Sequence, residues 1–333
     1  MKKRIITAIF MALIFVPVLV LPELFPLFQI LMGVLSLTAT IEIINMYEKK
    51  KKFPGIVKYL IMICSVLIYL SATTEWQVLA ETWELTGATP DIANDQRWIS
   101  YELLKIFNIN INFLPMLLLC SILLFSMLVV YKDFNGDDIG KCLVAILYPP
   151  LGFAGMTILR SIGFRFILYM FMITVLTDVF AYFTGMLFGK HKMCPLISPK
   201  KTWEGAIGGT IIATLCATLF AFFYGKMFGS SFGPSEATTL LHDAPFLTSE
   251  FVDKLNNVEI FAILFVLSLV TSIVSQIGDL VASKLKRTYE LKDYGDIFPG
   301  HGGILDRFDS AIFACMLLIT VFCIMFNLSI RGM

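Results

Sequence analysis

The chain alternates long apolar runs with short polar connections, and most of the runs are longer than the helices of a soluble domain. A membrane-spanning helix needs about 20 mostly apolar residues. Alternating ten-residue apolar segments, which are typical of a membrane β-barrel, do not occur in the sequence. The pattern therefore predicts an all-α, polytopic transmembrane helix bundle with nine spans, at residues 5–21, 24–47, 56–73, 111–131, 140–158, 164–188, 206–228, 258–282 and 310–328.

The composition supports the same class of protein. Of the 333 residues, 57% are hydrophobic and 15% are charged, whereas a soluble domain has about 45–50% apolar and about 25% charged residues. These values exclude a soluble globular enzyme and a disordered chain. The seven cysteines are scattered and form no Cys-x-x-Cys pair, so the sequence predicts neither a disulfide framework nor a zinc site.

The basic residues are concentrated in alternate connections. Most of the 26 Lys and Arg residues lie in segments 1–4, 48–58, 132–141, 189–201 and 283–307. The positive-inside rule therefore predicts a cytoplasmic N-terminus and an outer C-terminus. The first run has no small-x-small cleavage site, so we interpret it as a retained anchor. The lysine run 49–52 has two readings that stay open, a topology signal or attraction of anionic lipid.

One predicted cytoplasmic segment, residues 278–310, is too polar for an ordinary connection. Asp279 lies at the end of an apolar run, and an acid at membrane depth indicates function by default. Ser283 and Lys286 follow on the same helical face, and Asp306 shares a face with Asp309. A hairpin between the two spans would bring the three carboxylates together. Oxygen ligands of this kind are those that Mg²⁺ prefers.

Basic side chains and a glycine-rich turn surround these acids. The turn, residues 299–303, has backbone N–H groups that can approach a phosphate closely. Acids that hold Mg²⁺ beside bases that hold phosphate oxygens are typical of phosphoryl or nucleotidyl transfer. The sequence has no Walker A loop, which excludes a P-loop ATPase. The bases are Lys284, Lys286, Arg287, Lys292 and Arg307.

A second segment, residues 178–205, offers further contacts for phosphate and for a base or sugar. Asp178 lies within an apolar run, near its predicted cytoplasmic end. Ser198-Pro199 is expected to start a turn, and His191 is interpreted as a loop residue rather than a catalyst. The residues that offer contacts after that turn are Lys200, Lys201, Thr202 and Glu204.

With these motifs in view, the chain resembles the membrane phosphatidate cytidylyltransferases, also called CDP-diacylglycerol synthases. Residues 283–309 match the family's order Ser-x-apolar-Lys-Arg, Lys-Asp, then His-Gly-Gly-x-x-Asp-Arg-x-Asp, and residues 198–205 match its Ser-Pro-Lys-Lys-Thr motif. The likeness begins near residue 140, which suggests N-terminal membrane spans at 1–135 and a catalytic membrane domain at 136–333. One departure is Val179, where the family usually has Ser or Thr.

The resemblance implies transfer of CMP from CTP to phosphatidate, giving CDP-diacylglycerol and pyrophosphate for phospholipid biosynthesis. It implies Mg²⁺ held by Asp279, Asp306 and Asp309, and a second cation such as K⁺. The catalytic residues that it implies are Asp279, Ser283, Lys286, Arg287, Lys292, Asp293, His301, Asp306, Arg307 and Asp309. The substrate-binding residues that we assign beside them are Asp178, Lys200, Lys201, Thr202 and Glu204.

The expected partners are CTP, phosphatidate and membrane lipid, with no nucleic acid, and the oligomeric state is open, with a homodimer as one alternative. The expected location is the cell (inner) membrane, with the active site facing the cytoplasm. Two other readings stay open. One is a cytidylyltransferase for a different lipid phosphate, which the motifs do not distinguish from an enzyme that acts on phosphatidate. The other is an ion-coupled transporter that uses Asp178 and Asp279.

Overall fold

The fold is described from a computed structural model, and its regular structure in the residues described is helical apart from one short hairpin. Within the described residues, eight helices are long and apolar enough to cross a membrane. They correspond to eight of the nine predicted spans. Of the remaining span, 5–21, residues 5–12 lie outside the described residues. The described residues are 13–85, 111–228, 239–242, 244, 247, 252, 254–297 and 302–331.

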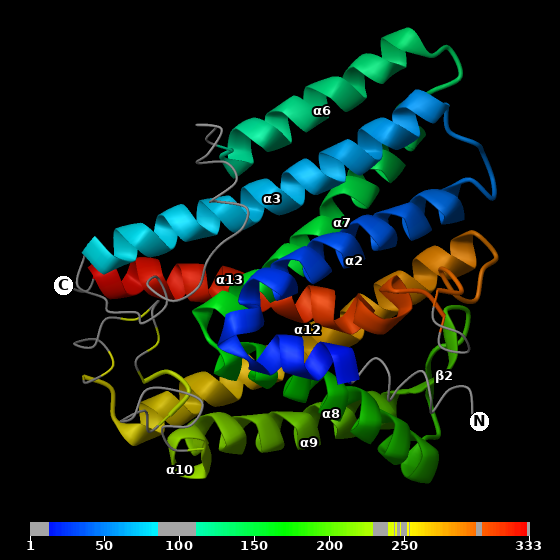
Figure 1. The fold of residues 1–333 in the computed structure, drawn as a ribbon. Coiled ribbons are helices and arrows are strands. Elements are labelled where there is room, and N and C mark those ends of the chain that lie inside the picture. Colours follow the sequence, from blue (N-terminus) through cyan, green and yellow to red (C-terminus); the bar gives the residue numbers. More distant parts are fainter. Residues whose placement is uncertain are drawn as a thin grey trace. The chain divides into compact units, whose positions relative to one another are not determined.

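The spans can be followed by colour in Figure 1. A short 3-10 turn, η1 (Pro22–Leu24), leads into α2 (Phe25–Tyr47), and α3 (Gly55–Leu85), α6 (Phe113–Val130) and α7 (Gly136–Ile162) follow. Next come α8 (Phe164–Phe188), α9 (Trp203–Phe222) and the short α10 (Tyr224–Phe228). The chain then forms α12 (Asn257–Thr288) and α13 (Leu305–Arg331).

The chain forms two compact units that interleave along the sequence. The first unit contains residues 1–79, 95–158 and 285–308, and the second contains 80–94, 159–284 and 309–333. Helices α12 and α13 therefore each pass from one unit into the other. The first unit holds the N-terminal spans together with the segment that links α12 to α13.

Buried hydroxyl groups join the helices of the first unit. The Thr40 hydroxyl in α2 lies 2.8 Å from that of Ser65 in α3. Further along α3, the Tyr69 hydroxyl donates to the Gln29 carbonyl in α2 at 2.8 Å and lies 2.9 Å from the Thr157 hydroxyl in α7. Such bonds are stabilising between apolar helices, where lipid offers no competing donor or acceptor.

The helices of the second unit are joined in the same way. Tyr169 in α8 is hydrogen-bonded to Ser268 in α12 at 2.6 Å, and two turns further along, Thr177 is bonded to Ser272 at 2.7 Å. Glycines bring α8 and α9 together, since a Cβ added at Gly209 would lie 2.7 Å from the Thr177 carbonyl oxygen. Small residues at such crossings let two backbones approach closely, and Figure 1 shows these two helices side by side.

The structure confirms the predicted span 140–158 and differs from the sequence-based expectation in one local detail. The predicted span 140–158 contains Pro149 and Pro150, yet both prolines lie inside the continuous helix α7. Ser198-Pro199 was expected to start a turn, but it begins strand β2 (Ser198–Thr202), which pairs antiparallel with β1 (Lys192–Cys194). Proline is tolerated in such a short strand because each strand of a two-stranded sheet has a free edge.

Candidate active site

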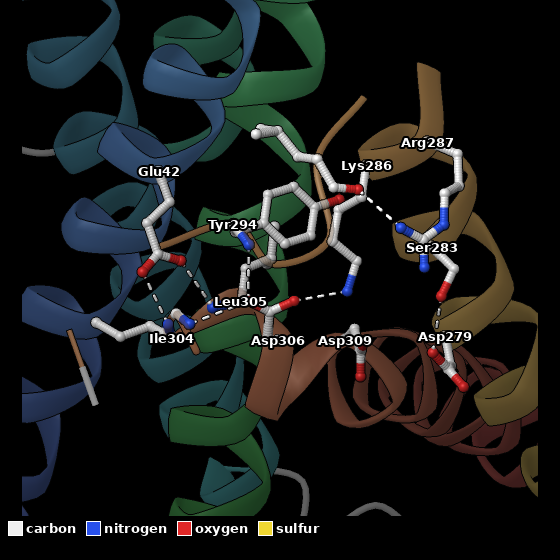
Figure 2. A network of polar contacts seen from close by, with 12 residues as sticks. Glu42, Asp279, Ser283, Lys286, Arg287, Tyr294, Ile304, Leu305, Asp306 and Asp309 are labelled. Atoms are coloured by element: carbon white, nitrogen blue, oxygen red, sulfur yellow. Dashed lines mark hydrogen bonds and ion pairs between the residues drawn. The ribbon is translucent and has the colours of Figure 1, made fainter. Parts of the chain in front are cut away.

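A nearly buried ion pair forms the centre of the polar segment in the first unit. Lys286, in the last turns of α12, donates to Asp306 Oδ1 at 2.6 Å, and their side chains are 11% and 4% exposed. The other carboxylate oxygen, Oδ2, accepts the N–H of Tyr294 at 2.8 Å and that of Gly303 at 3.0 Å. Asp306 thus has three donors within the protein, and Figure 2 shows this network.

Four other predicted residues of this segment lie on the surface. The side chains of Arg287, Lys292, Asp293 and Arg307 are exposed, and Arg287 also donates to the Leu291 carbonyl at 3.0 Å. His301 was predicted as a catalytic residue and lies outside the described residues. The segment therefore combines one fixed ion pair with exposed charges that are accessible to a polyanionic ligand.

Asp279 is the corresponding acid of the second unit. Its Oδ2 forms an ion pair with Lys201, from strand β2, and its Oδ1 accepts a hydrogen bond from the Ser283 hydroxyl at 3.3 Å. Asp178 in α8 lies near enough to interact electrostatically with both Asp279 and Lys201. The predicted motifs at 178–205 and 278–283 are thus brought together around one lysine, although they are about 80–100 residues apart in sequence.

Asp309 lies in α13 where that helix packs tightly against α12. A Cβ added at Gly278 would lie only 2.8 Å from the Asp309 carbonyl oxygen, so Gly278 allows this approach. Asp309 is 9% exposed, and its Oδ1 accepts the N–H of Ser310 at 2.8 Å. Asp279 and Asp309 therefore lie on adjoining helices of one unit, as Figure 2 shows.

The carboxylate oxygens of Asp279, Asp306 and Asp309 are ligands of the kind that a hard divalent cation such as Mg²⁺ prefers. Among the described residues there is no group of three or more His, Cys, Asp or Glu side chains arranged to hold a metal ion. Asp279 is compensated by Lys201 and Asp306 by Lys286. A cation bound at either carboxylate would compete with the lysine already there.

The β-hairpin that carries Lys200 and Lys201 is held at its base by Thr202 and Glu204. The buried Thr202 hydroxyl caps α9 by accepting the N–H of Gly205 at 3.2 Å. The Glu204 carboxylate accepts the N–H groups of Lys190 and His191 and contacts His191 Nδ1 at 2.6 Å. Thr202 and Glu204 thus shape the hairpin, and their predicted contact with nucleotide stays a prediction.

The two adjacent lysines have different surroundings. Side chains alternate along a strand, and accordingly Lys200 is exposed whereas Lys201 is directed to Asp279. The hydroxyl that the family usually places after the intramembrane acid is replaced here by Val179. Thr177, the residue before Asp178, does carry a hydroxyl, but this hydroxyl is buried and hydrogen-bonded to that of Ser272.

The lysine run 49–52 is partly used inside the protein. Lys51 pairs with the buried Asp138 and donates to the Asp133 carbonyl, while the Lys50 ammonium lies 5.1 Å from the centre of the Tyr289 ring. Burial raises the pKa of the Tyr289 hydroxyl, with Lys141 opposing the change. Two of the four lysines therefore fasten connections of the first unit, in addition to any role in orientation or lipid attraction.

Sequence reasoning missed Glu42 in α2. This side chain is only 4% exposed, and its two oxygens accept the N–H groups of Ile304 at 2.8 Å and Leu305 at 3.0 Å. The signal was present, because Glu42 is an acid inside an apolar run, as Asp178 and Asp279 are, and such acids indicate function. It was passed over because no motif surrounds it.

Comparison with known proteins covers nearly the whole chain. The model of the cytidylyltransferase family matches residues 2–325. A phosphatidate cytidylyltransferase of Staphylococcus haemolyticus is 35% identical over 96% of this chain and 97% of its own. Relatives with the same name from Staphylococcus epidermidis and Staphylococcus aureus are 34% and 33% identical, also over 96% of this chain and 97% of theirs. The chain therefore belongs to the cytidylyltransferase family.

Proposed function

We propose that this membrane protein is a phosphatidate cytidylyltransferase, which transfers CMP from CTP to phosphatidate and releases pyrophosphate. The observation that carries the proposal is the full-length similarity, 33–35% identity over 96% of the chain, to relatives that bear this name. The ordered motifs at 198–205 and 283–309 support it, since they supply the acids and bases that a nucleotidyl transfer needs.

The reaction needs no nucleophilic side chain. A phosphate oxygen of phosphatidate attacks the α-phosphorus of CTP, a new P–O–P bond forms, and the bond between the α- and β-phosphates breaks as pyrophosphate leaves. The task of the protein is to hold two polyanions close together and to balance their charge. In the second unit, Lys201 is proposed to bind phosphate. In the first unit, the same role is proposed for the exposed Arg287, Lys292 and Arg307 and for Lys286, which pairs with Asp306.

A divalent cation is part of the proposal. Asp279 and Asp309 are the proposed ligands in the second unit. The sequence-based assignment of Asp306 as a further ligand stays a prediction. When bound, Mg²⁺ would neutralise phosphate charge as pyrophosphate departs. A second cation, such as K⁺, stays a prediction of the family resemblance.

The orientation completes the proposal. CTP is a cytoplasmic nucleotide, so the segments 178–205 and 278–310 must face the cytoplasm, as the distribution of basic residues indicates. In this orientation, Lys192, Asp296 and the other exposed charges of the two segments lie at the membrane surface, where the phosphate of a lipid meets a soluble nucleotide.

The proposed function is tested with purified protein, CTP, Mg²⁺ and a panel of lipid phosphates. We expect phosphatidate to give CDP-diacylglycerol with one pyrophosphate released for each lipid converted. A panel member other than phosphatidate that reacts much faster would assign a different lipid phosphate. Absence of CMP transfer to every lipid in the panel would refute the proposal.

For the metal site, we expect Asp279→Asn to reduce turnover by about 100-fold or more, which is the order of effect when one electrostatic contact to a reacting group is removed. A chelator should silence the wild type, and Mg²⁺ should restore it. Asp296→Asn is the matched control, because Asp296 is an exposed acid of the same segment without an assigned role. A wild-type rate for Asp279→Asn at saturating Mg²⁺ would remove Asp279 from the site.

For the two lysines, we expect unequal defects. Lys201→Ala should lower the maximal rate tenfold or more, because it also removes the ammonium group that pairs with Asp279. Lys200→Ala should act through the Michaelis constant for CTP or phosphatidate, as expected of a contact made equally in the ground and transition states. Lys192→Ala, on the neighbouring strand, serves as the control. Titration of both substrates measures the constants, and wild-type values for both variants would leave the hairpin without a substrate contact.

For the orientation, we expect single cysteines introduced by Lys192→Cys and Asp296→Cys, in a background without native cysteines, to react with an impermeant thiol reagent only from the cytoplasmic side. Glu236→Cys, in the predicted outer connection 229–257, should react only from outside. Labelling of position 296 from outside would overturn the proposed placement of the active site.

A further inference from the structure

The buried acid Glu42 receives two backbone N–H groups from a segment more than 260 residues further along the chain. A carboxylate inside an apolar span is unfavourable unless hydrogen-bond donors or cations compensate it. The donors to Glu42 in the described part of the chain are the amides of Ile304 and Leu305, one for each carboxylate oxygen. Figure 2 shows both bonds beside the Lys286–Asp306 pair.

These amides belong to the start of α13, where the first N–H groups of a helix have no partner within the helix. The positive end of the helix dipole also favours a negative charge here. The neighbouring amide of Gly303 donates to Asp306 at 3.0 Å. The three successive N–H groups of residues 303–305 are therefore bound to carboxylates of the protein, and one of them, that of Gly303, belongs to the turn 299–303. The predicted approach of that turn to a phosphate stays a prediction.

The position of Glu42 also accounts for two glycines. A Cβ added at Gly303 would lie 2.5 Å from Glu42 Oε1, and one added at Gly295 would lie 2.9 Å from the same atom. Real Cβ atoms do not approach an oxygen so closely, so a larger residue at either position would displace the carboxylate. Glu42 thus explains, in physical terms, the second glycine of the His-Gly-Gly motif.

We propose that Glu42 is a positioning residue for the transferase reaction, and this inference rests on the function proposed above. By holding the amides of Ile304 and Leu305, Glu42 fixes Asp306 at the first turn of α13. Asp306 in turn holds the Lys286 ammonium and the Tyr294 amide. An N-terminal span thereby sets the place of a phosphate-binding lysine near the C-terminus, without touching the substrate itself.

The first test is Glu42→Gln, which keeps the size of the side chain but turns one acceptor into a donor that faces an N–H group. We expect kcat to fall tenfold or more while the thermal unfolding temperature in detergent changes little. Glu42→Asp should recover part of the loss, because it keeps both acceptors. The matched control is Thr40→Val. Thr40 is buried in the same helix, and its hydroxyl is hydrogen-bonded to the Ser36 carbonyl and the Ser65 hydroxyl.

A second test separates positioning from general stabilisation. If Glu42 acts through Asp306 and Lys286, then Glu42→Gln in a Lys286→Ala background should lower kcat by less than threefold further. A full tenfold further loss there would overturn the inference. Gly303→Ala should lower kcat as Glu42→Gln does, because the added methyl group would displace the Glu42 carboxylate. The pair Glu42→Ala and Gly303→Ala should be no worse together than Glu42→Ala alone, because the clash is then removed.

Hydrogen exchange gives a readout that does not depend on activity. In the wild type, the amides of Ile304 and Leu305 should be protected, and Glu42→Gln should expose them while Thr40→Val leaves them unchanged. Equal protection in Glu42→Gln and wild type would refute the contact. If the wild type proves inactive on every lipid, the proposed function fails, whereas the exchange result still decides whether Glu42 holds this segment. Should Glu42→Gln not insert into the membrane, Gly303→Ala supplies the same exchange test.

Discussion

A carboxylate in the apolar part of a membrane protein has to be compensated, and this requirement organises both units of the structure. In the second unit, Asp279 is matched by Lys201. In the first, Asp306 is matched by Lys286 and Glu42 by two backbone amides. Each acid comes from a helix, and each compensating donor lies in another element or at the far end of the same polar segment. The polar segments are thus folded around the acids.

The compensating groups are of two chemical kinds, and the difference suits a transferase. A lysine is a point charge on a flexible stem, so it can turn from a carboxylate towards a phosphate when an anionic substrate arrives. A backbone amide at a helix start has no such freedom. Lys201 and Lys286 are therefore suited to exchange partners during a reaction, while the amides at Glu42 keep the first turn of α13 fixed. In the role proposed for it, Glu42 keeps the first turn of α13 in place while the Lys286 ammonium changes its partner.

The sequence predicted the helices well because membrane spans depend on a local property, the length of an apolar run. Eight predicted spans correspond to helices of the described chain, including α7, which continues through Pro149 and Pro150. The motif acids and bases were also found, since their spacing is local. The pairing of Lys201 with Asp279 and the packing of Glu42 against Ile304 depend on contacts between distant segments. No local periodicity encodes those contacts, and for that reason the strand at Ser198 and the role of Glu42 were missed.

The same contacts bear on how the chain is divided. The sequence predicts a boundary near residue 136, between motif-free spans and motif-rich ones, and this division stays a prediction. The first compact unit joins residues 1–79 and 95–158 to residues 285–308. Without α2, the amides of Ile304 and Leu305 would have no carboxylate acceptor, and an unpaired buried N–H is costly. The family match likewise extends over residues 2–325 rather than over the motif-rich half alone. Through the contact of Glu42 with Ile304 and Leu305, the N-terminal span α2 packs against the start of α13, which is the basis of the positioning role proposed for Glu42.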